Sequence, residues 1–373
     1  MKLAFVFGTR PEIIKLSPLI RACIDRKLEF FTIHTGQHYS PSMSHLFINE
    51  LELPEPDYNL DIKSSAPYRQ GEHTGKMMSI LEEIILAEMP SVVMVHGDTN
   101  TTLAGALVTS KISTTRSFTG FDIKLGHVEA GLRSYDRSMP EEINRVITDH
   151  LSNYLFAPTQ GAKEIAIGEG IKEEKVFVTG NTIVDALTFG VDIINKGVDF
   201  LKKNGIKKNE YMLMTLHRQE NVDNEKILKD IIDGVERTAA ETNVPVIFPM
   251  HPRTVKMFDK FKIKPSEVIK PIEPCGFLEF LQLEANARLV FTDSGGVQEE
   301  TCALGVPCVT LRTSTERPET VDVGANIIAG VHADDIYSSS KKMLENFIAK
   351  ENPLGDGKAS QKILDIIIKD VEK

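Results

Sequence analysis

The sequence predicts an α/β protein built from two doubly wound domains that face a central cleft. Short apolar segments alternate with stretches of helical periodicity along the whole chain. Most of the apolar segments are nearly continuous, as in parallel strands that helices cover on both faces. The alternation occurs twice in succession, and a chain of 373 residues has room for two domains. We therefore expect ligands at the carboxyl ends of the strands and in the cleft.

The apolar segments define the strands, and the periodic stretches between them define the helices. In the first domain, strands are predicted at residues 3–7, 30–34, 92–96, 125–128, 154–157 and 176–179, with helices at 11–26, 74–88, 102–111 and 141–151. The second half repeats this rhythm. It predicts strands at residues 211–216, 246–250, 289–292 and 308–311, with helices near 225–241, 276–286 and 297–304.

The first domain is expected to span residues 1–180 and the second residues 181–357. A strand ends near residue 179, and a predicted helix at 182–195 leads into the polar segment 196–210, which we interpret as a solvated linker. A final helix lies within residues 358–373, after a segment rich in glycine and proline. The sequence leaves open whether this helix packs back on the first domain.

The chain is acidic, because 43 Lys and Arg residues stand against 53 Asp and Glu residues and leave a net charge of −10. Nonspecific binding to nucleic acid or to anionic lipid needs a basic surface, so neither partner is expected. No apolar run approaches the ~20 residues of a membrane-spanning helix. The apolar stretch at residues 3–7 is too short for the core of a signal peptide. We expect a soluble, cytoplasmic protein.

The four cysteines are Cys23, Cys275, Cys302 and Cys308. They form no C-x-x-C pair and have no histidine at zinc-finger spacing, so no metal site is predicted. Cys302 and Cys308 lie in apolar segments, which favours buried free thiols and a reducing compartment.

The segment after the first strand carries two cations. Gly8-Thr9-Arg10-Pro11-Glu12 has the features of a helix start, since proline suits the first turn and glutamate suits the positive end of the helix. That role does not explain Arg10 and Lys15, which suit an anion at the carboxyl edge of a strand. The G-x-G-x-x-G pattern of a nicotinamide site is absent, and no cofactor is expected.

Three acidic residues of the first domain follow strands or begin a helix. Asp98 lies at the tip of the third strand, Glu129 directly follows the fourth, and Glu141 starts a helix. A helix cap explains Asp98 equally well, and compensation of the helix dipole explains Glu141. An acidic residue directly after a buried strand is costly unless it is paired or functional. The three carboxylates can converge on one cleft, where such groups divide acid and base roles.

Polar segments also follow the strands of the second domain. His217-Arg218 comes after a buried strand, which favours a phosphate or leaving-group role. Asp293-Ser294-Gly295-Gly296 leads from a strand into a helix, whose free amides and dipole can cradle a diphosphate. Glu300 is placed to bind ribose hydroxyls, and Arg317 adds a cation. The second domain is therefore predicted to hold a nucleoside diphosphate.

Together these segments resemble those of the non-hydrolysing UDP-N-acetylglucosamine 2-epimerases, which have two Rossmann-like domains arranged as in GT-B glycosyltransferases. The matching segments are 8–12 with Lys15, 97–99, 127–133, 140–145, 217–218, 293–300 and 315–319. The resemblance implies reversible interconversion of UDP-N-acetylglucosamine and UDP-N-acetylmannosamine for surface polysaccharide or glycan precursors. It also implies anti elimination of UDP to 2-acetamidoglucal, syn re-addition, and a homodimer.

The resemblance also implies residue roles by position. The residues expected to be catalytic are Asp98, Glu129, Glu141 and His217. The residues expected to bind the UDP-N-acetylhexosamine are Arg10, Lys15, Arg145, Phe280, Ser294, Gly295, Gly296, Glu300 and Arg317. Phe280 is expected on the uracil side. Elimination fits the chemistry as well. The hydrogen at carbon 2 is not next to a carbonyl, and without a nicotinamide the enzyme must expel the diphosphate to acidify it.

The chain departs from the family pattern in two places. The stretch between Asp98 and Glu129 is longer, and we interpret residues 114–122 as a surface insertion. Bacterial members have Gln-His-Arg where this chain has Gln37-His38-Tyr39, in a region where the substrate itself activates the enzyme. That allosteric role is therefore not carried over.

Other functions remain open at this point. A GT-B glycosyltransferase shares the fold and the UDP site but needs an acceptor, and an epimerase for a UDP-diacetamido sugar differs in a few loop contacts. A hydrolysing epimerase usually brings a kinase domain, for which 373 residues leave no room. A nucleotide-sugar sensor has no use for three clustered carboxylates.

Overall fold

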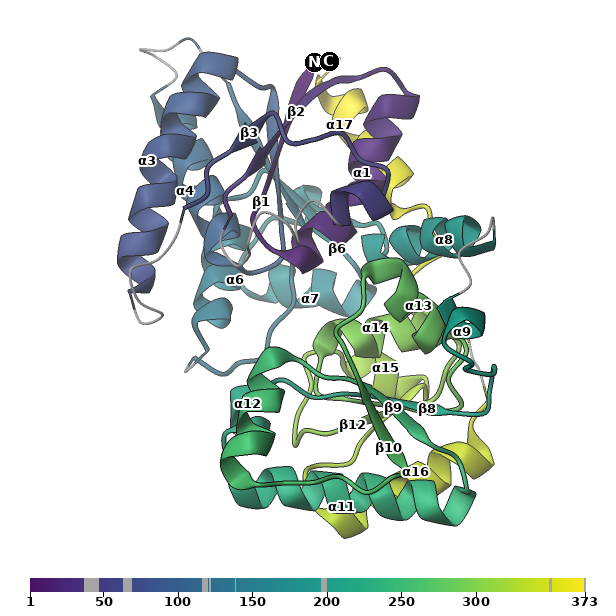
Figure 1. Ribbon diagram of the computed structural model, residues 1–373. Coiled ribbons are helices and arrows are strands. Elements are labelled where there is room, and N and C mark those ends of the chain that lie inside the picture. The colour runs from purple at the N-terminus through teal and green to yellow at the C-terminus, as the bar shows by residue number, and fades with distance from the viewer. Residues whose placement is uncertain are drawn as a thin grey trace. The chain divides into compact units, whose positions relative to one another are not determined.

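The computed structural model describes residues 1–36, 47–62, 69–115, 120, 122–137, 139–195, 200–348 and 351–371. The chain forms two compact units (Figure 1). The first consists of Met1–Ala186 with Leu354–Lys373, and the second of Leu187–Pro353. Each unit contains one parallel sheet flanked by helices, which confirms the predicted α/β class with two doubly wound sheets.

The first unit is built on a seven-stranded sheet in the order β3-β2-β1-β4-β5-β6-β7. Its strands are β1 (Lys2–Phe7), β2 (Glu29–His34), β3 (Tyr58–Asn59), β4 (Val92–His96), β5 (Lys124–Val128), β6 (Tyr154–Ala157) and β7 (Val176–Val178). The strand order reverses between β1 and β4, which are neighbours in the sheet. All but the two-residue β3 were predicted, because their apolar side chains are buried.

Helices cover both faces of this sheet. They are α1 (Arg10–Asp25), α3 (Gln70–Glu88), α4 (Asn100–Thr114), α6 (Pro140–Leu151), α7 (Gln160–Gly168) and α17 (Ala359–Val371), and α8 (Thr182–Asn195) runs from the first unit into the second. On one face, Met77 and Leu81 of α3 and Val108 of α4 share a core with Val6 and Val95 of the strands. The opposite face carries α1, and α17 lies beside it (Figure 1).

The C-terminal helix α17 is fastened to the first unit by polar contacts at both of its ends. At its start, Asp185 accepts hydrogen bonds from the amides of Ala359 (3.1 Å) and Ser360 (2.9 Å). Near its end, Asp370 accepts a hydrogen bond from the Tyr154 hydroxyl at 2.6 Å and pairs with Lys124 at 2.5 Å. The first unit is therefore assembled from two distant parts of the sequence.

The second unit is built on a six-stranded parallel sheet in the order β10-β9-β8-β11-β12-β13. Its strands are β8 (Met212–Thr215), β9 (Val246–Pro249), β10 (Ile269–Ile272), β11 (Val290–Thr292), β12 (Cys308–Thr310) and β13 (Asn326–Ile328). The order reverses between β8 and β11. The two strands that sequence analysis missed are the edge strands. In β10, Lys270 and Pro271 are exposed and interrupt the apolar run, which an edge position tolerates.

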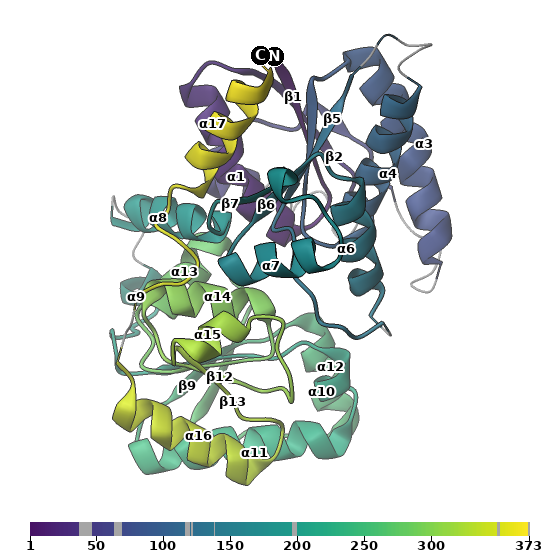
Figure 2. The ribbon, with the colours of Figure 1, turned by 180° about the vertical axis from the view of Figure 1, so that it is seen from behind.

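Helices also cover the sheet of the second unit. They are α9 (Phe200–Lys203), α10 (Gln219–Val222), α11 (Glu225–Thr242), α12 (Pro252–Phe261), α13 (Phe277–Ala285), α14 (Gly295–Leu304), α15 (Pro318–Asp322) and α16 (Ala333–Asn346). Helices α11 and α16 lie side by side against one core, to which they contribute Ile231 and Ile336 (Figure 2). A second core contains Leu283 of α13 and Val297 of α14. Both faces of this sheet are therefore covered.

All four cysteines are free, and Cys302 and Cys308 are buried as predicted. Burial raises the pKa of the Cys308 thiol to about 12 and that of Cys302 to about 11. These thiols therefore stay protonated and take part in packing. No helix in the described ranges is both long and apolar enough to cross a membrane.

Candidate active site

The sheet of the first unit reverses its strand order between β1 and β4, and such reversal points are where doubly wound sheets bind ligands. The segment after β1 carries Arg10 and Lys15, and the segment after β4 carries Asp98. The Arg10 guanidinium stacks over the ring of Phe47, 4.6 Å from its centroid. The residues predicted from these two strand ends therefore lie where the topology favours a site.

Glu12 links the start of α1 to the start of α4. Its Oε2 accepts hydrogen bonds from the amides of Gly8 (2.9 Å) and Thr9 (2.7 Å). Its Oε1 accepts from the hydroxyls of Thr99 (2.7 Å) and Thr102 (3.1 Å). Sequence analysis explained Glu12 as compensation for the helix dipole. In the structure it also fixes the loop that follows β4 and so positions the carboxylate in that loop.

Asp98 is paired with Arg145 of α6. The guanidinium approaches Oδ2 through Nε at 2.9 Å and through a terminal nitrogen at 2.6 Å. The same guanidinium pairs with Glu142 at 2.6 Å. Burial acts to raise the pKa of Glu142, but hydrogen bonds from the backbone of Ser134 and from Arg145 outweigh it, so the pKa lies below its ordinary value. The lowered pKa favours the anionic form of Glu142, which pairs with the guanidinium that also binds Asp98.

Glu129 adopts a left-handed backbone conformation with φ +68°, which is unfavourable for a residue other than glycine. Its carboxylate forms a buried ion pair with Lys15, at 8% and 6% side-chain exposure. Its Oε2 also accepts a hydrogen bond from Asn181 at 3.2 Å and lies 3.4 Å from Nε2 of His96. Backbone strain of this kind is concentrated at functional sites, which supports the predicted role of Glu129.

Glu141 is exposed at the start of α6, whereas the neighbouring Glu142 is buried. Within the described residues, Glu141 makes no hydrogen bond or ion pair, so the structure joins it to neither Asp98 nor Glu129. Its carboxylate is available to solvent or to a ligand. Two of the three predicted carboxylates are thus fixed by cations, and the third is exposed.

A buried network supports the ends of β4 and β5. His127 lies between two acceptors, Oδ1 of Asp149 at 2.7 Å and the carbonyl oxygen of Gly97 at 2.8 Å. Arg133 pairs with the other oxygen of Asp149 at 2.8 Å. Burial acts to raise the pKa of Asp149, but the hydrogen bond from His127 and the charges of both partners bring it below its ordinary value. Sequence analysis did not single out Asp149, which lies within a helix.

In the second unit, the reversal point lies between β8 and β11. His217 follows β8, and Asp293 follows β11. Nδ1 of His217 is 2.9 Å from Oδ1 of Asp293, while the amides of His217 (3.0 Å) and Arg218 (2.8 Å) donate to Oδ2. Asp293 is fully buried, whereas the His217 side chain is 44% exposed. The strand ends are therefore joined by one carboxylate, and the histidine remains open to a ligand.

Helix α14 begins directly after Asp293 with Ser294, Gly295 and Gly296. In the described part of the chain, the amides of Gly295 and Gly296 donate to no acceptor, as expected at a helix N-terminus. A Cβ built on either glycine meets nothing closer than 3.8 Å. Packing within the protein therefore does not require glycine at these positions. What glycine provides is open backbone that an anion can approach.

Two buried ion pairs support the loop that carries Arg317. Arg317 pairs with Glu299 of α14, a residue that is 1% exposed. Arg312 forms two contacts with Glu316, at 2.8 and 2.9 Å. Burial acts to raise the pKa of Glu316, but the hydrogen bond and charge of Arg312 lower it to about 2. The loop after β12 is thus held beside α14 by charge.

Glu300 and Phe280 are both half-buried. Glu300 follows Glu299 on α14, and Phe280 on α13 packs against the core that contains Leu283 and Val297. The roles predicted for ribose and uracil binding remain predictions.

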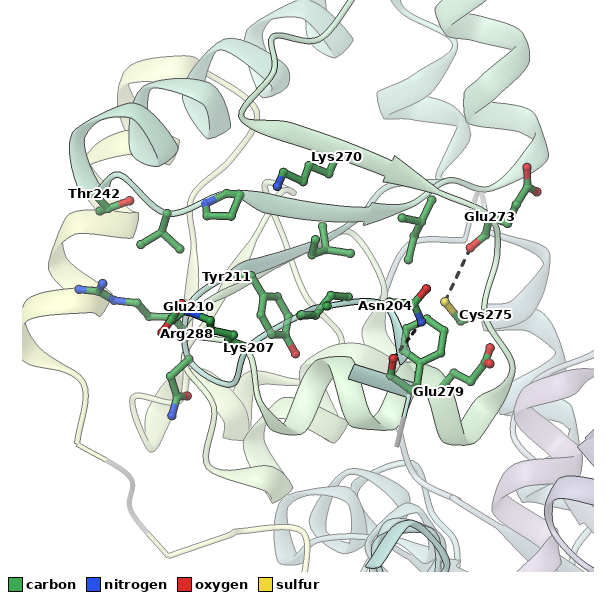
Figure 3. Close-up of a pocket in the computed structure, with 18 of the residues that line it drawn as sticks. Asn204, Lys207, Glu210, Tyr211, Thr242, Lys270, Glu273, Cys275, Glu279 and Arg288 are labelled. Atoms are coloured by element: carbon green, nitrogen blue, oxygen red, sulfur yellow. Dashed lines mark hydrogen bonds and ion pairs between the residues drawn. The ribbon is translucent and has the colours of Figure 1, made fainter. Parts of the chain in front are cut away.

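The second unit contains a cavity of about 990 Å³ (Figure 3), and Tyr211 of its lining belongs to the core against which Phe280 and Cys275 pack. Tyr211, which precedes β8, and Arg288, which precedes β11, both line it. It is therefore at the amino ends of these strands, opposite to His217 and Asp293. No residue predicted for the site is among its lining residues. We do not assign the substrate to this cavity.

Two sequence observations fall outside the described residues. These are Gln37-His38-Tyr39, where the chain departs from the bacterial pattern, and most of the interpreted insertion at 114–122. Within the ranges that the structure does describe, no group of three or more His, Cys, Asp or Glu side chains is placed to hold a metal ion.

Comparison with known proteins gives a consistent result. Residues 21–368 match the family model described as UDP-N-acetylglucosamine 2-epimerase. A Methanocaldococcus jannaschii protein named UDP-N-acetylglucosamine 2-epimerase is 51% identical, over 98% of this chain and 99% of its own length. A Pseudomonas aeruginosa protein named UDP-2,3-diacetamido-2,3-dideoxy-D-glucuronate 2-epimerase is 38% identical, over 99% of this chain and 100% of its own length.

Comparison of the fold with solved structures points to the same family. The crystal structure of a Methanocaldococcus jannaschii UDP-GlcNAc 2-epimerase in complex with UDP-GlcNAc and UDP superimposes with a TM-score of 0.89 at 50% identity, covering 99% of this chain and 100% of that one. Both the sequence match and the fold extend over essentially the whole chain. The resemblance seen in the sequence is thereby confirmed, and the chain belongs to the UDP-N-acetylglucosamine 2-epimerase family.

Proposed function

We propose that this chain interconverts UDP-N-acetylglucosamine and UDP-N-acetylmannosamine without a cofactor, for surface polysaccharide or glycan precursor synthesis. Its family membership and its close relative of the same name support this activity. So does the structural neighbour whose crystals contain UDP-GlcNAc and UDP.

The reaction proceeds by loss and return of UDP. Anti elimination removes the hydrogen at carbon 2 and the diphosphate at carbon 1, and gives 2-acetamidoglucal. Syn re-addition of UDP then places the new hydrogen on the other face of carbon 2. The chemistry needs groups that move a proton at carbon 2 and groups that stabilise the negative charge on the departing diphosphate.

The proton-moving groups are the carboxylates Asp98, Glu129 and Glu141. Arg145 holds Asp98 and Lys15 holds Glu129 in place through ion pairs. Glu141 is exposed and lies on the same helix as Arg145. Substitution of each carboxylate separately shows which of the three the reaction needs.

The diphosphate is held by the second unit. The open amides of Gly295 and Gly296, the Ser294 side chain and the helix dipole bind its oxygens. Arg317 and His217 from this unit, and Arg10 from the first, add donors that stabilise the leaving group. Glu300 binds the ribose and Phe280 the uracil side, as the family resemblance implies.

The observation that carries the proposal is the buried pairing of Glu129 with Lys15 at a strained backbone position. A glycosyltransferase can use a carboxylate to deprotonate its acceptor, but it does not exchange the hydrogen at carbon 2. The test is incubation with UDP-N-acetylglucosamine alone in heavy water. We expect deuterium at carbon 2 and formation of the manno epimer, both followed by NMR. An absence of exchange in the wild type, with Glu129→Gln as the inactive control, would contradict the proposal.

A second candidate substrate is a UDP-diacetamido sugar, because a relative that covers the whole chain carries that name. The same exchange experiment with the diacetamido substrate tests it. Faster exchange with that sugar than with UDP-N-acetylglucosamine would identify it as the preferred substrate.

We also propose a homodimer in the cytoplasm. The dimer follows from the family resemblance, and sedimentation should give about twice the 41.5 kDa of one chain. The compartment is supported by four free cysteines, which fit a reducing environment. Cell fractionation with antibody detection checks it, and recovery outside the cytoplasm would contradict it.

A further inference from the structure

The environment of His217 raises the question of which ring nitrogen is presented to the ligand. Nδ1 lies 2.9 Å from Oδ1 of Asp293, and in the described part of the chain Nε2 makes no hydrogen bond. The side chain is 44% exposed, so Nε2 is the nitrogen available to a bound molecule.

Asp293 is an acceptor with no hydrogen to give. Burial acts to raise its pKa, but the hydrogen bond and charge of His217 and the amides of Arg218 and His217 bring it below its ordinary value. An ionised carboxylate only accepts hydrogen bonds, so Nδ1 of His217 must carry the hydrogen between them. With Nδ1 donating to Asp293, Nε2 is the ring nitrogen that faces a bound diphosphate, and it donates to that anion only when it carries a hydrogen as well.

Asp293 also joins the histidine to the diphosphate cradle. The carboxylate binds the amides of His217 and Arg218 after β8, and the next residue in the chain is Ser294, the N-cap of α14. The hydroxyls of Thr215 and Thr292 connect the same two strands at 2.6 Å. His217 and the start of α14 are therefore held in a fixed relation within one unit.

We propose that Asp293 is a positioning residue for His217, which it holds with hydrogen on Nδ1 so that Nε2–H donates, as part of a cation, to the diphosphate. This inference rests on the proposed function and extends it to a residue outside the catalytic set. The carboxylate contributes orientation and charge to the contact with the leaving group. It does not touch the substrate itself.

Asp293→Asn is a sharp test because the structure dictates how the amide must turn. Oδ2 accepts from the His217 and Arg218 amides and from Nδ2 of Asn221 at 3.3 Å, so the asparagine oxygen must take that place. Its NH₂ group then faces Nδ1. A ring that faces a donor at Nδ1 carries its single hydrogen on Nε2 and cannot become the cation.

The kinetic arm compares Asp293→Asn, His217→Gln and the double variant. We expect Asp293→Asn to lower kcat by about 100-fold with little change in KM, on the usual scale for acid–base groups. The double variant should lose no more than His217→Gln alone, because the two residues act as one unit. Losses that multiply, or a change confined to KM, would overturn the proposal.

Asn221→Ala is the matched structural control. It removes a donor to the same carboxylate without touching the ring, so kcat should stay near the wild-type value while thermal unfolding reports any loss of stability. A loss of kcat as large as that of Asp293→Asn would place the effect in packing and overturn the proposal.

A spectroscopic experiment tests the role of Asp293 without depending on catalysis. In ¹⁵N-histidine NMR, His217 should carry hydrogen on Nδ1 in the wild type and only on Nε2 in Asp293→Asn. A wild-type Nδ1 without hydrogen would overturn the inference. If the wild type catalyses no exchange at carbon 2, the proposed function fails, and this arm still decides the role of Asp293.

Discussion

In both units the candidate functional groups lie where the strand order of the sheet reverses, but the chemical groups differ between the two units. In the first unit, side-chain charges dominate, since Asp98 is fixed by Arg145 and Glu129 by Lys15. In the second unit, backbone amides at the start of α14 lie open, and the charged side chains around them are paired with one another. Both sites lie where the strand order reverses.

This difference fits the task that we propose for each site. Moving a proton requires groups whose protonation changes, and their pKa values are set by neighbouring charges. Holding a diphosphate requires donors in fixed positions, which backbone amides supply. The comparison teaches that the first site should be sensitive to the loss of a single charge and the second to a change in shape.

The largest effect is expected from charge removal in the first unit. Asp98→Asn and Glu129→Gln should each lower turnover by at least about 100-fold, because each removes a group that we propose exchanges a proton with the sugar. Affinity for UDP, measured by calorimetry, should stay close to that of the wild type. Glu164→Gln, on the exposed face of α7, is the control and should retain turnover. Near-normal turnover in both test variants would contradict the proposal that side-chain charges of the first unit carry out the proton transfer.

A smaller effect is expected from a change of shape in the second unit. Gly295→Ala adds a methyl group that meets no protein atom closer than 3.9 Å, so folding should be unaffected, but the group lies on the backbone that a diphosphate approaches. We expect UDP affinity to fall about tenfold, which corresponds to about 1.4 kcal/mol. Gly161→Ala is matched, since this glycine is near the start of α7 with equal space. Equal UDP affinity in both variants would show that the cradle is not at α14.

The third expected effect concerns the stability of the fold rather than catalysis or UDP binding. The folded-state pKa of Glu316 is about 2, against an ordinary value of 4.5. The ion pair therefore adds fully to the free energy of unfolding above pH 4.5, and this contribution is lost as the pH falls toward 2. The full contribution is about 3 kcal/mol. Glu316→Gln should be less stable than the wild type at pH 7, and the gap in thermal unfolding temperature should narrow below pH 4.5. Glu220→Gln, at an exposed pair, should differ little from the wild type at any pH. If the difference in thermal unfolding temperature between Glu316→Gln and the wild type stays constant with pH, the assigned ion pair is contradicted.

Much of the fold could be predicted because buried parallel strands are nearly continuous apolar runs. The strands β4 and β6 begin and end at the predicted residues. Of the four edge strands, the rule finds β7 but misses β3, β10 and β13: β3 has only two residues, and β10 exposes Lys270 and Pro271. Prediction from burial therefore works where burial is complete.

The candidate site could be predicted in part for a similar reason. The positions of Asp98 and Glu129 at strand ends were visible in the sequence, since an acidic residue after an apolar run stands out. Their partners were visible only as cations without assigned contacts. Asp293 satisfied the same rule as Glu129, yet its contact with His217 bridges 76 residues of sequence and needed the fold. Glu142 was indistinguishable from Glu141 until the loop at Ser134 placed amides around it.

The docking of α17 on α1 has a consequence for biogenesis. The first unit lacks this helix until all of the second unit has been synthesised, because Leu187–Pro353 comes between them in the sequence. The apolar side chains Ile363, Leu364 and Ile367 then cover a surface that has remained open during translation. The second unit can complete its fold first, and the first unit, which carries Asp98 and Glu129, is finished last.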